Sequence, residues 1–142
     1  EITEFFFYWR SKIVENEPPP RTSIDPVEIP SFLPGIVLYQ MINGGERIRF
    51  RLRGTRLTKP YGRDCTELFA DEVFSEEFSD AIHTALRSVA TSWRPHYWEI
   101  NTPVKSRAFT AYRRIVLPLL SVQKDSDILI GYHTVAKELP NE

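Results

Sequence analysis

Cysteine is nearly absent from this chain: Cys65 is the only one in 142 residues, so no disulfide can form within it. This fits a reducing compartment, and we expect a cytoplasmic location. No apolar run approaches the roughly 20 residues that a membrane helix needs, and the first residues carry acids rather than the basic start of a signal peptide. An excess of one charge is also missing, because the net charge is −1, and this excludes a strongly basic nucleic-acid binder.

The motifs of common catalytic and metal sites are missing as well. The sequence has no glycine-rich phosphate loop and no HExxH, CxxC or GxSxG motif. Its three histidines, His83, His96 and His133, do not have the spacing of metal ligands. We therefore predict no metal site and no catalytic residue.

Apolar and charged residues alternate over residues 47–53. In a strand, the apolar residues would face one side and the charged residues the other. A Gly-Gly pair precedes this stretch, and residues 36–43 before it are rich in β-forming residues. These patterns predict a β-hairpin with Phe50 and Leu52 directed inward. The opposite side would carry an outward row of arginines: Arg47, Arg49, Arg51 and Arg53.

Aromatic and apolar residues recur at helical spacing near the start of the chain, which predicts an amphipathic helix over residues 3–16. Further aromatic residues lie outside its apolar face, so the first turns are apolar on nearly all sides. Such a helix needs two partners, and its second side packs either on the rest of its own chain or on a second copy. The interface candidates are Phe6, Phe7, Tyr8 and Trp9.

Residues 17–34 are predicted to link this helix to the hairpin. Three consecutive prolines favour an extended polyproline segment, which we expect to cross the surface. Asp25, Pro26 and Glu28 then stand at the N-cap, first and third positions of a short helix that would end at Pro34.

A long amphipathic helix is predicted after the hairpin. Its apolar residues run at helical spacing from Phe74 to Val89, and Ser75 or Asp71 would cap its start. Three strand-like segments follow, over residues 94–101, 108–120 and 127–135. This order contains no alternating parallel units and predicts an α+β fold, an antiparallel sheet with helices on one face.

Five fragments in this order resemble bacterial PAS domains, in particular a family of short single-domain PAS proteins of largely unassigned function. They are Tyr8-Trp9-Arg10, Ile24-Asp25-Pro26, Phe50 to Thr55, Tyr61-Gly62-Arg63-Asp64 and Tyr112 to Leu119. The chain departs from that family at Glu67, where glycine is usual. The resemblance implies a five-stranded antiparallel sheet with helices on one face plus the N-terminal helix. It also implies one PAS-like domain over residues 1–142, with its core at 35–136.

This resemblance implies a non-catalytic sensory or regulatory module of bacterial signalling that works through ligand binding, protein interaction or both. We expect a homodimer, a signalling protein of unknown identity as partner and, where a ligand provides the input, a small apolar molecule. The input would shift the population between two arrangements of the helices. The sequence begins at Glu1 rather than Met, which is compatible with a piece of a longer protein.

PAS domains bind ligands between the long helix and the concave face of the sheet, and the resemblance places a candidate pocket there. His96 and Trp98 share one face of their strand with Ile100 and would line the pocket, or belong to the core or a dimer contact. The pocket candidates are Phe50, Leu52, Tyr61, Ile82, Leu86, His96 and Trp98.

Haem and flavin are not predicted as cofactors. His83 lies on the helix that carries the axial histidine in haem-binding PAS domains. The helical period turns it away from the apolar face, so we expect a solvent-exposed histidine. Cys65 lacks the asparagine-rich motif around the cysteine of flavin-binding light sensors, so we expect a packed free thiol.

Two other functions stay open at this point. A small α+β protein with a cavity around His96 could bind a ligand or act as an enzyme. The arginine row, together with Arg113 and Arg114, could bind nucleic acid beside Tyr97 and Tyr112. The neutral net charge favours instead a surface row that covers aromatic neighbours and pairs with acids of the N-terminal helix.

Overall fold

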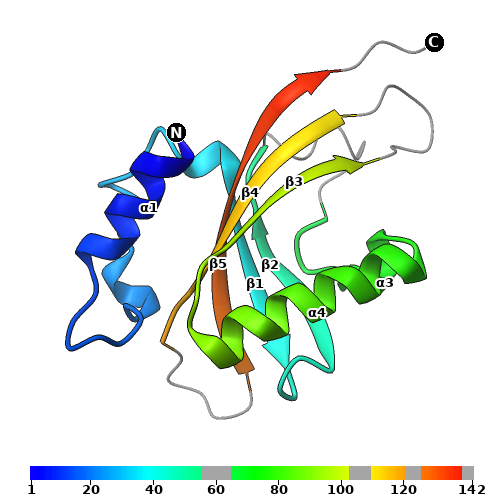
Figure 1. Ribbon diagram of the computed structural model, residues 1–142, viewed down its shortest axis with the longest axis horizontal. Coiled ribbons are helices and arrows are strands. Elements are labelled where there is room, and N and C mark those ends of the chain that lie inside the picture. Colours follow the sequence, from blue (N-terminus) through cyan, green and yellow to red (C-terminus); the bar gives the residue numbers. More distant parts are fainter. Residues whose placement is uncertain (56–64, 103–109, 121–125, 139–142) are drawn as a thin grey trace.

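The computed structural model describes residues 1–55, 65–102, 110–120 and 126–138. Five strands form one antiparallel sheet in the spatial order β2-β1-β5-β4-β3 (Figure 1). Their bounds are β1 Ile36–Ile42, β2 Arg47–Arg53, β3 His96–Thr102, β4 Thr110–Pro118 and β5 Ser126–Glu138. A hairpin, a helical crossover and a three-stranded meander thus build the predicted α+β fold.

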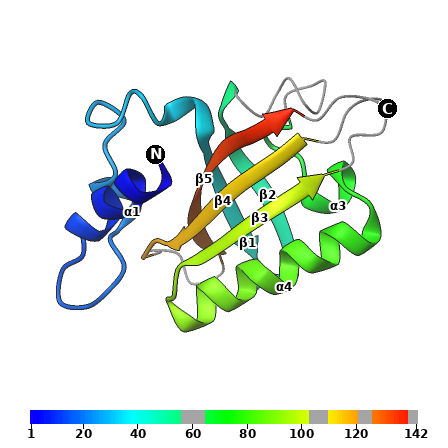
Figure 2. The ribbon, with the colours of Figure 1, turned by 45° about the horizontal axis from the view of Figure 1, so that its top comes forward.

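Helices cover both faces of the sheet (Figures 1 and 2). α4, Glu76–Ser92, packs on the face that we call the inner face, whereas α1, Ile2–Ser11, packs on the opposite, outer face. Side chains alternate between the faces, so β4 contributes Val116 to the inner core but Ile115 and Leu117 to the outer core. Burial on both faces explains the nearly continuous apolar runs in the central strands.

α4 begins and ends with clear capping residues. The hydroxyl oxygen of Ser75 accepts a hydrogen bond from the backbone N–H of Phe78 (3.4 Å), so the predicted cap Ser75 is confirmed. The helix ends at Trp93, which has a left-handed backbone conformation. Its sheet-facing residues are at most 3% exposed: Ile82, Leu86 and Val89. No described helix, α4 included, combines the length and apolar content needed to cross a membrane.

α1 packs its apolar side on its own chain. Phe5 and Trp9 are 0% and 4% exposed against the outer face. The indole N–H of Trp9 also donates a hydrogen bond to the backbone carbonyl oxygen of Pro118 in β4 (2.9 Å). The ring of Phe5 lies 5.0 Å from the ring of Tyr132 in β5. α1 is therefore joined to two neighbouring strands of the meander, β4 and β5.

The segment after α1 differs from the sequence prediction. α1 ends at Ser11 rather than near residue 16, because the chain turns back immediately after it. Pro18 and Pro19 are buried and do not cross the surface. The backbone N–H of Leu120 donates a hydrogen bond to the carbonyl oxygen of Pro19 (2.9 Å), so the proline segment lies beside the chain that follows β4.

The short helix predicted at Asp25 is a pair of turns. A carboxylate oxygen of Asp25 accepts a hydrogen bond from the backbone N–H of Val27 (2.9 Å) and forms an Asx turn. Two short 3-10 helices flank these turns, η1 Arg21–Ser23 and η2 Leu33–Gly35, and η2 leads directly into β1. This hydrogen bond between the side chain of Asp25 and the local backbone competes with helix formation here.

Gly54 ends β2 where this strand meets η2. Its N–H donates a hydrogen bond to the carbonyl oxygen of Ile36 (2.7 Å). A Cβ atom at position 54 would overlap the carbonyl group of Pro34 and lie 2.6 Å from the carbonyl oxygen of Leu33. The close approach of two backbone segments therefore requires glycine at this position.

Candidate functional site

Polar side chains gather on the inner face of the sheet. The strand register pairs Arg114 of β4 with His133 of β5 and with Trp98 of β3. His96 pairs with Val116 one position along the same face. Paired residues of antiparallel strands share a face, and Val116 belongs to the inner core. We use the name inner cluster for six residues: Tyr39, Arg53, His96, Trp98, Arg114 and His133.

A β-bulge brings Arg53 into the inner cluster. Leu38 pairs with Leu52 but Tyr39 pairs with Phe50, so β2 has one extra residue between the two pairs. The extra residue reverses the alternation, and Leu52 leaves the inner side with 43% exposure. Arg53 turns inward, and its guanidinium carbon lies 4.7 Å from the centre of the Phe50 ring. The predictions that Leu52 lines a pocket and that Arg53 faces outward are therefore wrong.

Arg114 is the most deeply buried charged side chain of the described residues, with 2% exposure. Its guanidinium carbon lies 4.9 Å from the centre of the Trp98 ring, and this cation–π contact restrains the guanidinium plane. Within the described part of the chain, the Nε and Nη2 atoms of Arg114 have no hydrogen-bond partner. Buried donors and buried charges are costly when unpaired, so the Nε and Nη2 atoms of Arg114 could donate hydrogen bonds to an anion.

Tyr39 contributes a hydroxyl group from β1. Its oxygen lies 3.4 Å from Nε2 of His133. Burial raises the pKa of Tyr39, and the positive charges of Arg114 and Arg53 oppose part of this rise. A Cβ atom at Gly131 would lie 2.8 Å from the Tyr39 ring, so this glycine gives the ring its room and keeps the hydroxyl near the arginines.

The surroundings of His96 favour its neutral form. Burial, followed by the positive charge of Arg114, lowers the pKa of His96 below its ordinary value of 6.5. Its ring meets the ring of Trp98 edge-on, with centroids 5.7 Å apart. Among the described residues, its Nδ1 atom has no hydrogen-bond partner. A neutral imidazole in this place can donate or accept a hydrogen bond beside the guanidinium of Arg114.

We expect acidification to destabilise the protein partly through His96. The unfolded chain takes up a proton at its ordinary pKa of 6.5, whereas the folded state resists protonation until lower pH. Well above pH 6.5, His96 is neutral in both states and does not affect the free energy of unfolding. As the pH falls below 6.5, protonation of the unfolded chain lowers the free energy of unfolding. Urea unfolding at about pH 7.5 and pH 5.5 should show a smaller pH effect for His96→Gln than for the wild type. An equal effect in both proteins would contradict this prediction.

Three further pocket candidates form the apolar wall beside the inner cluster. Phe50, Ile82 and Leu86 belong to the inner core and are at most 3% exposed. Cys65 lies in the same core with 1% exposure, in agreement with the predicted packed thiol. Tyr61 lies outside the described residues.

Sequence reasoning found His96 and Trp98 but missed four members of the inner cluster: Tyr39, Arg53, Arg114 and His133. One signal was available for Arg114. β4 carries two consecutive arginines next to an apolar run, and a strand that is buried on both faces must direct one of them inward. No comparable pattern marked the other three residues.

His83 faces away from the inner core, as predicted, but it is buried. It is 8% exposed and lines a groove of about 490 Å³ with Asp71 of α3, Ala70–Val73, and with Glu46 of the β1–β2 turn. Its Nδ1 lies 2.6 Å from the carbonyl oxygen of Ser79, to which it donates a hydrogen bond. The expectation of a solvent-exposed histidine is wrong, because α3 and the hairpin turn cover this side of α4. The described residues contain no group of three His, Cys, Asp or Glu that could hold a metal ion.

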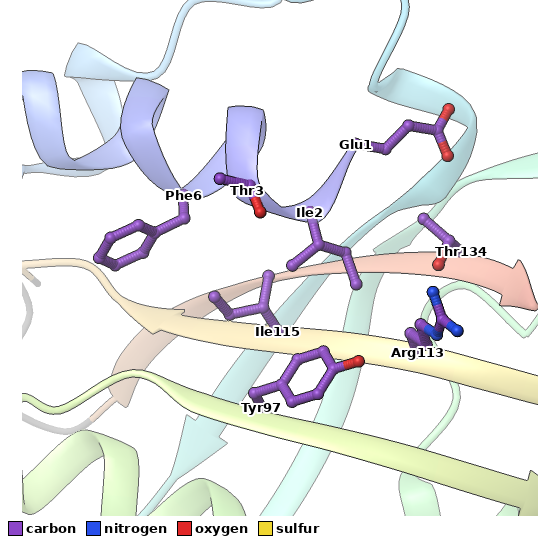
Figure 3. Close-up of a pocket in the computed structure, with 8 residues that line it drawn as sticks. All are labelled: Glu1, Ile2, Thr3, Phe6, Tyr97, Arg113, Ile115 and Thr134. Carbon is purple, nitrogen blue, oxygen red and sulfur yellow. The ribbon is translucent and has the colours of Figure 1, made fainter.

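A second groove, of about 540 Å³, lies on the outer face between α1 and the meander (Figure 3). Ile2 and Phe6 of α1 line one side, and Tyr97 of β3 and Ile115 of β4 line the other. Tyr97 is 51% exposed. α1 thus leaves part of the outer face uncovered beside the edge strand.

The four interface candidates on α1 have different surroundings. Trp9 is buried in its own chain, and the ring of Phe6 lies 5.9 Å from it. The hydroxyl of Tyr8 donates a hydrogen bond to Glu28 (2.9 Å), so the second side of α1 also packs on its own chain. Phe7 is 55% exposed. The predicted dimer contact stays a prediction, and Phe7 is its accessible residue.

The remaining arginines of β2 are paired with acids. Arg47 binds the carboxylate of Asp71 with two hydrogen bonds (2.9 and 2.8 Å) and lies 3.5 Å from the centre of the Phe69 ring. Arg51 pairs with Glu67 (3.3 Å). The sequence pattern predicted that these arginines would pair with acids of the N-terminal helix. That prediction is wrong, because both acids follow β2 in the chain. The described part of β2 therefore presents no continuous basic face.

Comparison with known proteins gives one family match. A family model described as a PAS domain matches residues 1–134. No curated protein matches the sequence.

Three solved structures resemble the fold. A domain of an HTR-like protein from Haloarcula marismortui is 15% identical with a TM-score of 0.53, and the match covers 72% of this chain and 98% of that one. The PAS domain of BvgS from Bordetella pertussis is 15% identical with a TM-score of 0.55, covering 74% and 79%. A fungal LOV domain photoreceptor is 14% identical with a TM-score of 0.51, covering 95% and 91%. At these identities the likeness concerns the fold alone.

Proposed function

This chain belongs to the PAS domain family, and from this premise we propose that it is a sensory module whose input is a small molecule bound at the inner cluster. PAS domains in general are sensory, non-catalytic modules of signalling proteins. The observation that supports the proposal is the buried guanidinium of Arg114, with donors that have no partner among the described residues, on the face that α4 covers. Convergent polar groups beside apolar residues are typical of small-molecule sites.

The strands β4 and β5, which contribute residues to the inner cluster, also pack against α1 on their outer face. On β4, Arg114 faces the inner cluster, whereas Ile115 faces the outer core that contains Trp9. On β5, His133 faces inward and Tyr132 contacts Phe5. A ligand that prefers one arrangement of these strands shifts the population toward that arrangement. The exposed side of α1, around Phe7, would then present the output to a second copy or to a signalling partner.

Hydrogen exchange tests this proposal. A library of metabolite-sized compounds is first screened by thermal denaturation, and the purified protein is examined by native mass spectrometry for a retained molecule. We expect a hit to slow exchange in α4 and, through β4 and β5, also in α1. Trp98→Ala should lose the response. Trp93→Ala should keep it, since Trp93 is 48% exposed at the end of α4. The proposal would be contradicted if native mass spectrometry showed the protein without a bound molecule and no compound raised its melting temperature.

A further inference from the structure

We propose that the inner cluster recognises the carboxylate group of a small organic acid, held side-on by the Nε and Nη2 atoms of Arg114. This inference rests on the small-molecule function proposed above and names the chemical class of its ligand. It differs from the sequence-based expectation of a purely apolar ligand, because the inner face contains one buried arginine, Arg114, and one half-buried arginine, Arg53.

The same protein shows how an arginine uses these two atoms. Nε and Nη2 of Arg47 donate to the two carboxylate oxygens of Asp71, at 2.9 and 2.8 Å. These donors lie on one edge of the guanidinium and match the spacing of two carboxylate oxygens. On Arg114 the corresponding two atoms are buried, and neither has a hydrogen-bond partner within the described residues. On Arg114, the edge that corresponds to the carboxylate-binding edge of Arg47 can therefore accept a carboxylate from a ligand.

The surroundings of Arg114 hold this edge in place. The ring of Trp98 lies against the guanidinium, and the side chain is 2% exposed, so its rotamers are restricted before a ligand arrives. The guanidinium also interacts with the hydroxyl of Tyr39, which leaves the Nε–Nη2 edge as the part without a partner in the described residues. A carboxylate would neutralise a charge that has already lost its hydration.

The rest of the site favours an apolar ligand body with few polar groups. Trp98 supplies a partly buried aromatic surface against Arg114, and Val116 of the inner core follows Arg114 on the same face of β4. The Nδ1 atom of His96 has no hydrogen-bond partner within the described residues, and an imidazole can hydrogen-bond a hydroxyl or carbonyl group of the ligand. An aryl or acyl carboxylate satisfies both features. The two donors of this edge satisfy the two oxygens of a carboxylate, whereas a phosphate carries further oxygens and more charge, so phosphate is a separate arm of the test.

The test compares three carboxylates with their uncharged amides at fixed ionic strength. The probes are benzoate, phenylacetate and hexanoate, each paired with its primary amide, and inorganic phosphate is a separate arm. We expect at least one carboxylate to raise the melting temperature in a saturable manner and its amide to have no effect. Isothermal titration calorimetry should then show affinity reduced by about tenfold or more in Arg114→Lys, which keeps the charge but loses the two-donor edge.

Two variants make the result specific. Arg113→Lys is the matched control, because Arg113 is the neighbouring residue on β4 but points outward and is 56% exposed beside Glu99. It should bind the acid like the wild type. Arg114→Met serves as a second variant should Arg114→Lys fold poorly, and it should not bind the acid.

The outcomes separate this inference from the broader function. Equal binding of acid and amide would overturn carboxylate recognition but leave a small-molecule sensor. Binding of phosphate in place of the acids would likewise overturn the carboxylate class. If no probe raises the melting temperature, carboxylate recognition is overturned as well. If, in addition, native mass spectrometry shows the protein without a bound molecule and the compound screen gives no hit, the sensory proposal is also contradicted.

Discussion

Replacing Gly54 with alanine is expected to reduce the free energy of unfolding by about 3 kcal/mol or more. The new Cβ would overlap the carbonyl group of Pro34 and approach the carbonyl oxygen of Leu33 to 2.6 Å. Both obstacles are backbone atoms, and the hydrogen bond from Gly54 to Ile36 (2.7 Å) fixes the strand against them. Neither side can move without breaking the start of β1. Urea unfolding followed by circular dichroism would measure the loss.

Gly44→Ala is the matched control for this substitution. Gly44 has a positive φ of 70° in the β1–β2 turn, but a Cβ there would meet no atom within 4 Å. Its cost is only that of a left-handed backbone, about 1–2 kcal/mol. If Gly54→Ala proved no more harmful than Gly44→Ala, the close contact between β2 and η2 would not be the reason for glycine at position 54.

The fold followed from patterns that are local in the sequence. The β1–β2 hairpin was predictable because alternation and a Gly-Gly turn lie within a short stretch, and α4 because its apolar period continues over its length. The end of α1 was not predictable, since it depends on the burial of Pro18 and Pro19 against the end of β4. That contact joins segments about a hundred residues apart and leaves no periodic signal in either one.

The candidate site was predictable only in part, for two physical reasons. The alternation of residues 47–53 is perfect, yet a bulge reverses the direction of Leu52 and Arg53, and a bulge changes pairing without changing the sequence pattern. The burial of His83 depends on α3 and on the hairpin turn, which a helical wheel does not include. His96 and Trp98 were found together because two residues that are two positions apart on one strand always share a face.

Arg114→Met is expected to make the ligand-free protein more stable, by about 1–4 kcal/mol. Arg114 is 2% exposed, and within the described residues its Nε and Nη2 atoms have no hydrogen-bond partner. Loss of its cation–π contact with Trp98 opposes the gain by about 0.5–2 kcal/mol, which is less than the usual cost of a buried unpaired cation. Thermal and urea unfolding of purified, ligand-free protein would measure the change.

Arg113→Met provides the comparison on the outer face. Arg113 is 56% exposed and lies 3.8 Å from Glu99, so its removal should change stability by no more than about 0.5 kcal/mol. A clear loss of stability in Arg114→Met would contradict the prediction. It would mean that the guanidinium of Arg114 is satisfied in the ligand-free protein and does not await an anion.

The two variants and a bound acid together separate a functional cost from a structural one. At about 100 times its dissociation constant, a ligand of the folded state adds about 2.7 kcal/mol to the free energy of unfolding. The wild type should therefore gain stability with a carboxylate that binds, whereas Arg114→Met should start higher and stay constant. An arginine retained for packing would show no such difference. A crossing of the two stability curves with rising acid concentration would show that the instability of the inner cluster is the property that makes it sensitive to its ligand.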